Sequence, residues 1–269
     1  MTIEVHTVDT LAQASAVLTG SARYFGGGTL LMRQINYGQQ SFDRLVVSTD
    51  PTLKQISVSG EQITIGAGVT MADVLRHNDL AFMADVARSV GGPAIRNMAT
   101  VGGNLFAPLP YGDFATALLA LNANVQWTDG QQSPVEHLFE QPAESPASRI
   151  VSSVSFRRPA SGTFRYLKVS RVKPKGVSVM TIAAVLNREN GRVGDTSIAF
   201  GGMAPRPRRA TSAETALRGS SLDEAGIDRC CAACTDGMAP TDDALASAWY
   251  RNEVAPVYLK RLLQQRSEY

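Results

Sequence analysis

The chain has 269 residues, of which 44% are hydrophobic and 19% charged, and its net charge at pH 7 is +2. This length supports one large domain or two modest ones with separate cores, so a small scaffold held by disulfides is excluded. The ordinary composition argues against a disordered chain, and the near-neutral charge argues against nucleic acid as a partner. Residues 1–10 are polar and no run of about 18 apolar residues occurs, so we expect no secretory leader, no integral membrane segment and a cytoplasmic location.

Helices and short strands alternate in the first part of the chain. Apolar spacing predicts helices over residues 10–18, 71–78, 81–89 and 113–121, with Thr70 as the N-cap of the second. Clusters of β-branched residues between turn signals predict strands at 23–25, 44–48, 56–59, 62–67, 124–128 and 150–156. Prolines and Gly162 then indicate a domain boundary near residues 157–162.

The last third of the chain begins with strands and ends with helices. The strands are predicted at 163–170, 177–186 and 196–201, and the last helix at 242–265, where it contains or is kinked at Pro256. This order is typical of an α+β domain. We therefore expect a first domain at 1–158, with subdomains of about 1–55 and 56–158, and a second domain at 162–269.

The cysteines and histidines give no pattern of metal ligands. The three cysteines, Cys230, Cys231 and Cys234, are too few for a four-cysteine site and cannot all pair in disulfides. We expect reduced thiols on a helix, and their role stays open. The three histidines are scattered, so we expect no metal site in this chain.

The first glycine cluster is Phe25-Gly26-Gly27-Gly28-Thr29-Leu30-Leu31, which follows a predicted strand. Successive residues without Cβ allow several backbone N–H groups to point at one anion, as a phosphate requires. The spacing matches neither the G-x-G-x-x-G fingerprint nor a P-loop. A tight turn without a ligand is an equally good interpretation of this cluster taken alone.

A second cluster, Thr100-Val101-Gly102-Gly103-Asn104, repeats these ingredients about seventy residues later. Two phosphate nests in one chain favour an extended diphosphate ligand, such as a dinucleotide between two subdomains. Asp113 follows at the start of a predicted helix. Its side chain is expected to cap that helix, to accept hydrogen bonds from ribose hydroxyls, or to do both.

These motifs together resemble the FAD-binding (medium) subunit of the molybdenum hydroxylases, the family of xanthine dehydrogenase and carbon monoxide dehydrogenase. The resemblance rests on residues 25–31, 99–105, Asp113, 164–171 and 198–210, so it covers nearly the whole chain. It implies an α+β fold, with a two-subdomain FAD-binding domain of the vanillyl-alcohol-oxidase-like type followed by an α+β C-terminal flavoprotein domain.

The resemblance also assigns residues to the cofactor, FAD. The diphosphate and the adjoining ribose would be bound by Phe25 to Leu31 and Thr100 to Asn104. Asp113 would accept hydrogen bonds from the adenosine side of the cofactor. Ile150 and Lys168 would lie near the isoalloxazine, where a lysine cation stabilises the anionic reduced flavin. Many family members carry an acidic residue in place of Leu30, so a polar contact from that side chain has no support here.

The function implied by the resemblance is electron transfer within a larger oxidoreductase, with no catalytic residue in this chain. Partners would be a large subunit with the molybdenum cofactor and a small subunit with [2Fe-2S] clusters, in an αβγ or (αβγ)2 complex. Electrons would arrive from the iron–sulfur subunit and leave to an external acceptor. The alternatives are a stand-alone FAD-dependent oxidoreductase of the same fold and a non-catalytic binding protein that lost the flavin.

Overall fold

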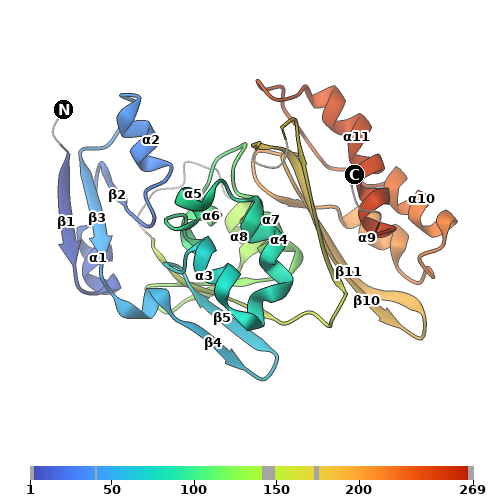
Figure 1. The fold of residues 1–269 in the computed structure, drawn as a ribbon, viewed down its shortest axis with the longest axis horizontal. Helices are drawn as coiled ribbons and strands as arrows, with labels where there is room; N and C mark the ends of the chain where they lie inside the picture. The colour runs from blue at the N-terminus through green and yellow to red at the C-terminus, as the bar shows by residue number, and fades with distance from the viewer. Residues whose placement is uncertain (1–2, 40, 141–148, 173–175, 266–269) are drawn as a thin grey trace. The chain divides into compact units, whose positions relative to one another are not determined.

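A computed structural model describes residues 3–39, 41–140, 149–172 and 176–265, which fall into two units (Figure 1). Unit 1 comprises Met1–Ala107 and Ala123–Arg157, and unit 2 comprises Pro108–Asn122 and Arg158–Tyr269. Helices and mainly antiparallel sheets occur in both, so the α+β class expected from the sequence is confirmed.

Unit 1 begins with a small parallel sheet of order β1-β3-β2. Its elements are β1 (Glu4–Val8), α1 (Leu11–Val17), β2 (Ala22–Tyr24), α2 (Leu31–Asn36) and β3 (Arg44–Ser48). Thr10 starts α1 with a capping box, in which its hydroxyl accepts from the N–H of Gln13. The glycine cluster connects the end of β2 to the start of α2, so the small sheet anchors that loop.

The rest of unit 1 is an antiparallel sheet of order β4-β5-β8-β6-β7 with short helices. The strands are β4 (Ile56–Ser59), β5 (Gln62–Gly66), β6 (Asn124–Trp127), β7 (Gln132–Pro134) and β8 (Val151–Arg157). The helices are η1 (Pro51–Lys54), α3 (Met71–Arg76), η2 (Asn78–Met83), α4 (Ala84–Ser89), α5 (Pro93–Arg96), α6 (Val101–Leu105) and α8 (Val135–Glu140). Alternating side chains of β5 and β8 are buried, as expected for a sheet covered on one face.

Unit 2 is built on an antiparallel sheet of order β12-β11-β10-β9. Its elements are α7 (Asp113–Ala120), β9 (Phe164–Ser170), β10 (Ser178–Glu189), β11 (Arg192–Gly201), β12 (Arg208–Arg209), α9 (Thr211–Leu217), α10 (Glu224–Ala232) and α11 (Ala248–Leu263). Helices cover the sheet on both sides (Figure 1). Because successive strand residues face opposite sides, Ile182 of β10 joins the core with α9, α10 and α11, while the Thr181 hydroxyl bonds to Thr116 of α7.

The final helix differs from the sequence prediction at its start. The prediction placed it at 242–265, whereas α11 begins at Ala248 because the Ser247 hydroxyl caps it by accepting from the N–H of Tyr250. Pro256 lies inside the helix, as expected. Arg251 is buried and donates to the carbonyls of Val179, Thr241 and Ala246 and to the Asp243 carboxylate, which fixes α11 against the sheet.

Candidate functional site

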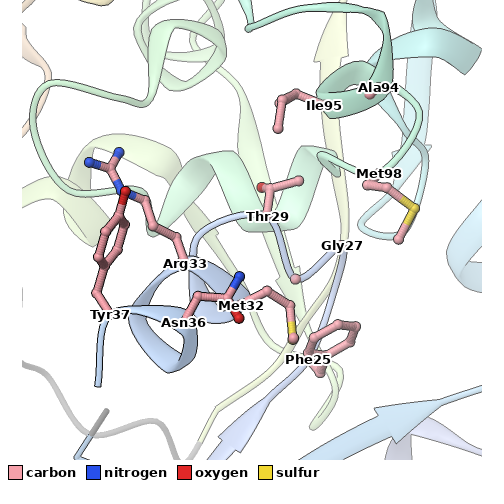
Figure 2. Close-up of a pocket in the computed structure, with 11 residues that line it drawn as sticks. Phe25, Gly27, Thr29, Met32, Arg33, Asn36, Tyr37, Ala94, Ile95 and Met98 are labelled. Carbon is pink, nitrogen blue, oxygen red and sulfur yellow. The ribbon is translucent and has the colours of Figure 1, made fainter. Parts of the chain in front are cut away.

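A cavity of about 490 Å³ lies in unit 1, beside the first glycine cluster (Figure 2). One wall is formed by the glycine loop and α2, and the other by residues 94–98. The lining residues are Phe25, Gly27, Gly28, Thr29, Met32, Arg33, Asn36, Tyr37, Ala94, Ile95 and Met98. Segments far apart in sequence therefore meet at one hollow, and the predicted glycine motif forms part of its wall.

The two walls touch at Gly27. A Cβ atom on Gly27 would lie 1.6 Å from the carbonyl oxygen of Met98, so no residue other than glycine fits without moving the backbone. A Cβ on the neighbouring Gly26 would lie 3.1 Å from the hydroxyl oxygen of Thr100. The structure thus brings together the two glycine clusters that the sequence singled out.

The conformation of the first loop also depends on Gly28. Its φ of +70° is left-handed, and a Cβ there would lie 2.1 Å from Cζ of Phe25, whose ring rests over the loop. At the start of the loop, the N–H of Phe25 donates to the carbonyl of Val46. At its end, the N–H of Met32 donates to the carbonyl of Gly28. The loop is therefore fixed at both ends.

The backbone donors between these ends are available to a ligand. From Gly26 to Leu30, no N–H group donates to another residue in the part of the chain that the structure describes. Unsatisfied N–H groups on consecutive residues attract an anion. This segment therefore has the properties of a phosphate nest.

The second cluster differs, because its donors are already used. Residues Val101 to Asn104 form most of α6, and Thr100 is the N-cap of this helix. Their N–H groups donate, in chain order, to the carbonyls of Val69 and Ala67, to the Thr100 hydroxyl and to the Thr100 carbonyl. The Asn104 side-chain amide also donates to the Thr100 carbonyl. The prediction of a second nest of unused backbone donors is therefore wrong, whereas the assignment of Thr100 to Asn104 to FAD stays a prediction. The cluster also supports the first loop, through the contact of Thr100 with Gly26.

Asp113 and Lys168 lie in unit 2 and pair with each other. Lys168 Nζ lies 2.9 Å from Asp113 Oδ2, and the side chains are 14% and 9% exposed. Ser178 donates its hydroxyl to the other carboxylate oxygen at 2.5 Å. Asp113 is the first residue of α7, and its N-cap is Gly112 with φ +96°, so the prediction that Asp113 caps the helix is wrong.

This pairing bears on the roles that the resemblance gives to the two residues. It placed Asp113 at the adenosine side and Lys168 at the isoalloxazine, yet their charged groups are in direct contact. Both oxygens of Asp113 are engaged within unit 2. Its carboxylate therefore fixes the position of the Lys168 ammonium.

The remaining predicted residues lie in unit 1. Ile150 is buried next to the start of β8, and its carbonyl accepts from the N–H of Thr128. Leu30 and Leu31 are half-buried at the start of α2. None of these three side chains lines the described cavity.

The face of α2 was missed at the level of sequence. Met32, Arg33, Asn36 and Tyr37 recur at intervals of three and four residues, so they share one side of this helix and line the cavity. The guanidinium carbon of Arg33 lies 5.7 Å from the centroid of the Tyr37 ring. The signal was the helical spacing of these residues directly behind the glycine cluster.

The cysteines lie apart from this cavity, in the core of unit 2. Burial raises the pKa of Cys231 to about 11 and that of Cys234 to about 12, and it raises the pKa of Cys230 as well. Within the described ranges, no group of three or more His, Cys, Asp or Glu residues is arranged to hold a metal ion. The helices in those ranges include none with the length and apolar character to cross a bilayer.

Comparisons with known proteins find a family match for each of two long segments of the chain. Residues 1–158 match the family described as the FAD binding domain in molybdopterin dehydrogenase. Residues 165–266 match the CO dehydrogenase flavoprotein C-terminal domain.

Individual relatives align over nearly the whole chain. The chain is 24% identical to the glyceraldehyde dehydrogenase medium chain of Sulfolobus acidocaldarius, covering 96% of this chain and 95% of that one. It is 26% identical to the carbon monoxide dehydrogenase medium chain of Afipia carboxidovorans, with 97% and 96% covered. A chain of a Cu,Mo-CO dehydrogenase crystal structure superimposes with a TM-score of 0.90 at 25% identity, with 98% and 97% covered.

Proposed function

Since this chain belongs to the family of FAD-binding domains in molybdopterin dehydrogenases, we propose that it is the electron-transferring FAD subunit of a multi-subunit molybdenum hydroxylase. Its membership of the medium-subunit family, its FAD cofactor and its place among the oxidoreductases agree with the expectations from sequence. The proposal concerns how FAD is held, where electrons come from and go, and which partners are present.

The observation that carries the proposal is the nest at Gly26 to Leu30. Its backbone N–H groups are left for a ligand, and the contact of Gly27 with the Met98 carbonyl holds the loop in place. Such a cradle, which a Cβ would fill, suits the diphosphate of FAD. In this proposal Phe25 to Leu31 hold the diphosphate. The segment from Thr100 to Asn104 packs against this loop, with the Thr100 hydroxyl beside Gly26.

Bound FAD accepts electrons singly and releases them as a pair, which links one-electron carriers to a two-electron acceptor. In unit 2, we propose that the Lys168 ammonium lies near the isoalloxazine, where a cation stabilises the reduced flavin. The Asp113 carboxylate and the Ser178 hydroxyl keep that ammonium in one position. Asp113 is thus a positioning residue. Ile150 is buried and packs in the core of unit 1.

The cysteines support the need for partner chains. The whole chain has three of them, all buried, which is one fewer than the four thiolates that usually bind a [2Fe-2S] cluster. We infer that a small [2Fe-2S] subunit delivers electrons and that a large subunit carries the molybdenum cofactor, in an αβγ or (αβγ)2 complex. Unpaired thiols also suit a cytoplasmic location.

The proposal is tested by purifying the complex from its native source through this chain. We expect absorbance bands at roughly 370 and 450 nm, release of FAD on denaturation, and two further chains with iron and molybdenum. Reduction of the complex by its organic substrate should bleach the flavin band. A flavin-free chain would support a non-catalytic binding protein, and a single chain that oxidises substrate by itself would support a stand-alone flavoenzyme.

A further inference from the structure

The phosphate nest leaves one electrostatic requirement unmet. A diphosphate is an anion, whereas the residues of the glycine loop, from Phe25 to Leu31, have no charged side chain. Backbone N–H groups offer only partial charges, and charge-assisted hydrogen bonds to phosphate are about twice as strong as neutral ones. A cation beside the nest would therefore add to both affinity and selectivity.

Arg33 is placed to supply this cation. Among the described residues that line the cavity, it alone is charged, and it shares the lining with Gly27, Gly28 and Thr29. Figure 2 shows Arg33 and Tyr37 side by side at the end of the hollow away from Met98. The ring of Tyr37 lies within cation–π distance of the guanidinium and restricts its orientation.

A second arginine near these walls has a structural role. Arg96 of α5 donates to the carbonyls of Gly91 and Arg88, so it holds the chain segment that precedes Ile95 and Met98. Its guanidinium does not line the cavity. Arg96 therefore belongs to the frame of the site, whereas Arg33 is one of the residues that line the cavity.

The geometry points to Arg33 as the residue that recognises the negative charge of the dinucleotide's diphosphate, with Tyr37 orienting the guanidinium. This inference rests on the proposed function, because it takes FAD as the ligand of the cavity. An arginine presents a planar fork of donors that matches phosphate oxygens, which a lysine does not. The remaining cavity wall, with Phe25, Ile95 and Met98, is apolar and suits the uncharged parts of the same ligand.

The test is flavin binding by the purified full chain after its flavin has been removed. FAD is titrated at low and high salt into the wild type, Arg33→Met, Arg33→Lys and the control Arg76→Met. Arg76 is an exposed arginine of the same unit that does not line the cavity. Riboflavin, which has no phosphate, is titrated in parallel, and melting temperatures report on folding.

We expect Arg33→Met to weaken FAD binding by about 10- to 100-fold at low salt and to reduce its salt dependence. Arg33→Lys restores part of the affinity, since the charge remains without the planar fork. Riboflavin binding by Arg33→Met and FAD binding by Arg76→Met stay at the wild-type level.

Three results separate the possibilities. If Arg33→Met binds FAD like the wild type with the same salt dependence, the inference about Arg33 fails while the proposed function stands. If Arg33→Met and Arg33→Lys lower FAD affinity without changing its salt dependence, Arg33 acts by packing and the inference again fails. If the wild type binds no FAD at any salt concentration, the proposed function itself fails.

Discussion

The ammonium group of Lys168 and the carboxylate of Asp113 form an ion pair at 2.9 Å that water barely reaches. Asp113 begins α7, and Lys168 lies in β9 at the edge of the sheet, so the pair ties this helix to the strands of unit 2. The charge that we assign to the flavin is therefore also part of the packing of its own unit.

Loss of either member of this pair should destabilise unit 2. Lys168→Met leaves the Asp113 carboxylate buried without its cation, and we expect the free energy of unfolding to fall by about 3–5 kcal/mol. The double variant Asp113→Asn with Lys168→Met should recover much of this loss, because no uncompensated charge remains. Urea denaturation of the single and double variants measures the coupling, and additive losses would contradict it.

The close approach of Gly27 to Met98 predicts a selective effect of adding one methyl group. Gly27→Ala pushes the loop off the Met98 carbonyl, and we expect a loss of about 1–3 kcal/mol in stability together with most of the bound FAD. Gly92→Ala is the matched control, since a Cβ there meets nothing within 4 Å and the residue has no left-handed φ. FAD content per chain after gel filtration checks both variants. Equal FAD content in Gly27→Ala and Gly92→Ala would show that the loop is not part of the FAD site.

Thr100 has two expected roles, which a second capping threonine separates. Thr100→Ala removes the hydroxyl that accepts from the N–H of Gly103, at a cost of about 1 kcal/mol. Thr10→Ala removes the equivalent cap of α1 at a similar cost. FAD affinity should fall only in Thr100→Ala, because this hydroxyl also lies against Gly26. Equal FAD affinities in the two variants would show that Thr100 only caps its helix.

The cysteine cluster predicts a loss of stability in alkali. The folded state raises the pKa of Cys231 to about 11 and that of Cys234 to about 12, from an ordinary value of 9.0. Between pH 9 and 11 the unfolded chain therefore releases these protons while the folded chain keeps them, and the free energy of unfolding falls as pH rises.

Each thiol contributes a slope of up to about 1.4 kcal/mol per pH unit in that interval. Urea denaturation at pH 8, 9 and 10 measures this slope, and Cys231→Ala should make it shallower than in the wild type. Thiol reagents at pH 7.5 should label the cysteines only after denaturation. Rapid labelling of the native chain would contradict their burial.

The sequence predicted most elements, because their signals are local. The N-cap of α3 at Thr70 and the helix at Asp113–Ala120 follow from capping and apolar spacing. The glycine loop was also identified, since consecutive glycines after a strand indicate a loop whose backbone N–H groups can point at one anion. What brings it into contact with Met98, however, is a tertiary arrangement that no local pattern records.

The errors have physical causes too. The two glycine clusters look alike in sequence, but Thr100 caps a helix that consumes the donors of the second, whereas the first has no such cap. Arg33 was missed because α2 is only six residues long, so its periodicity is too short to stand out. The contact between Lys168 and Asp113 was not foreseen, because it spans 55 positions of the chain.

One further consequence concerns α7, whose residues are all buried and which packs on β10 and β11 although it lies in the chain between two parts of unit 1. The polypeptide therefore passes from one unit to the other at residues 107–108, 122–123 and 157–158. Three covalent connections join the units, so no single proteolytic cut releases either of them intact. A fragment ending at residue 158 would carry α7 without the sheet against which its apolar side chains are packed.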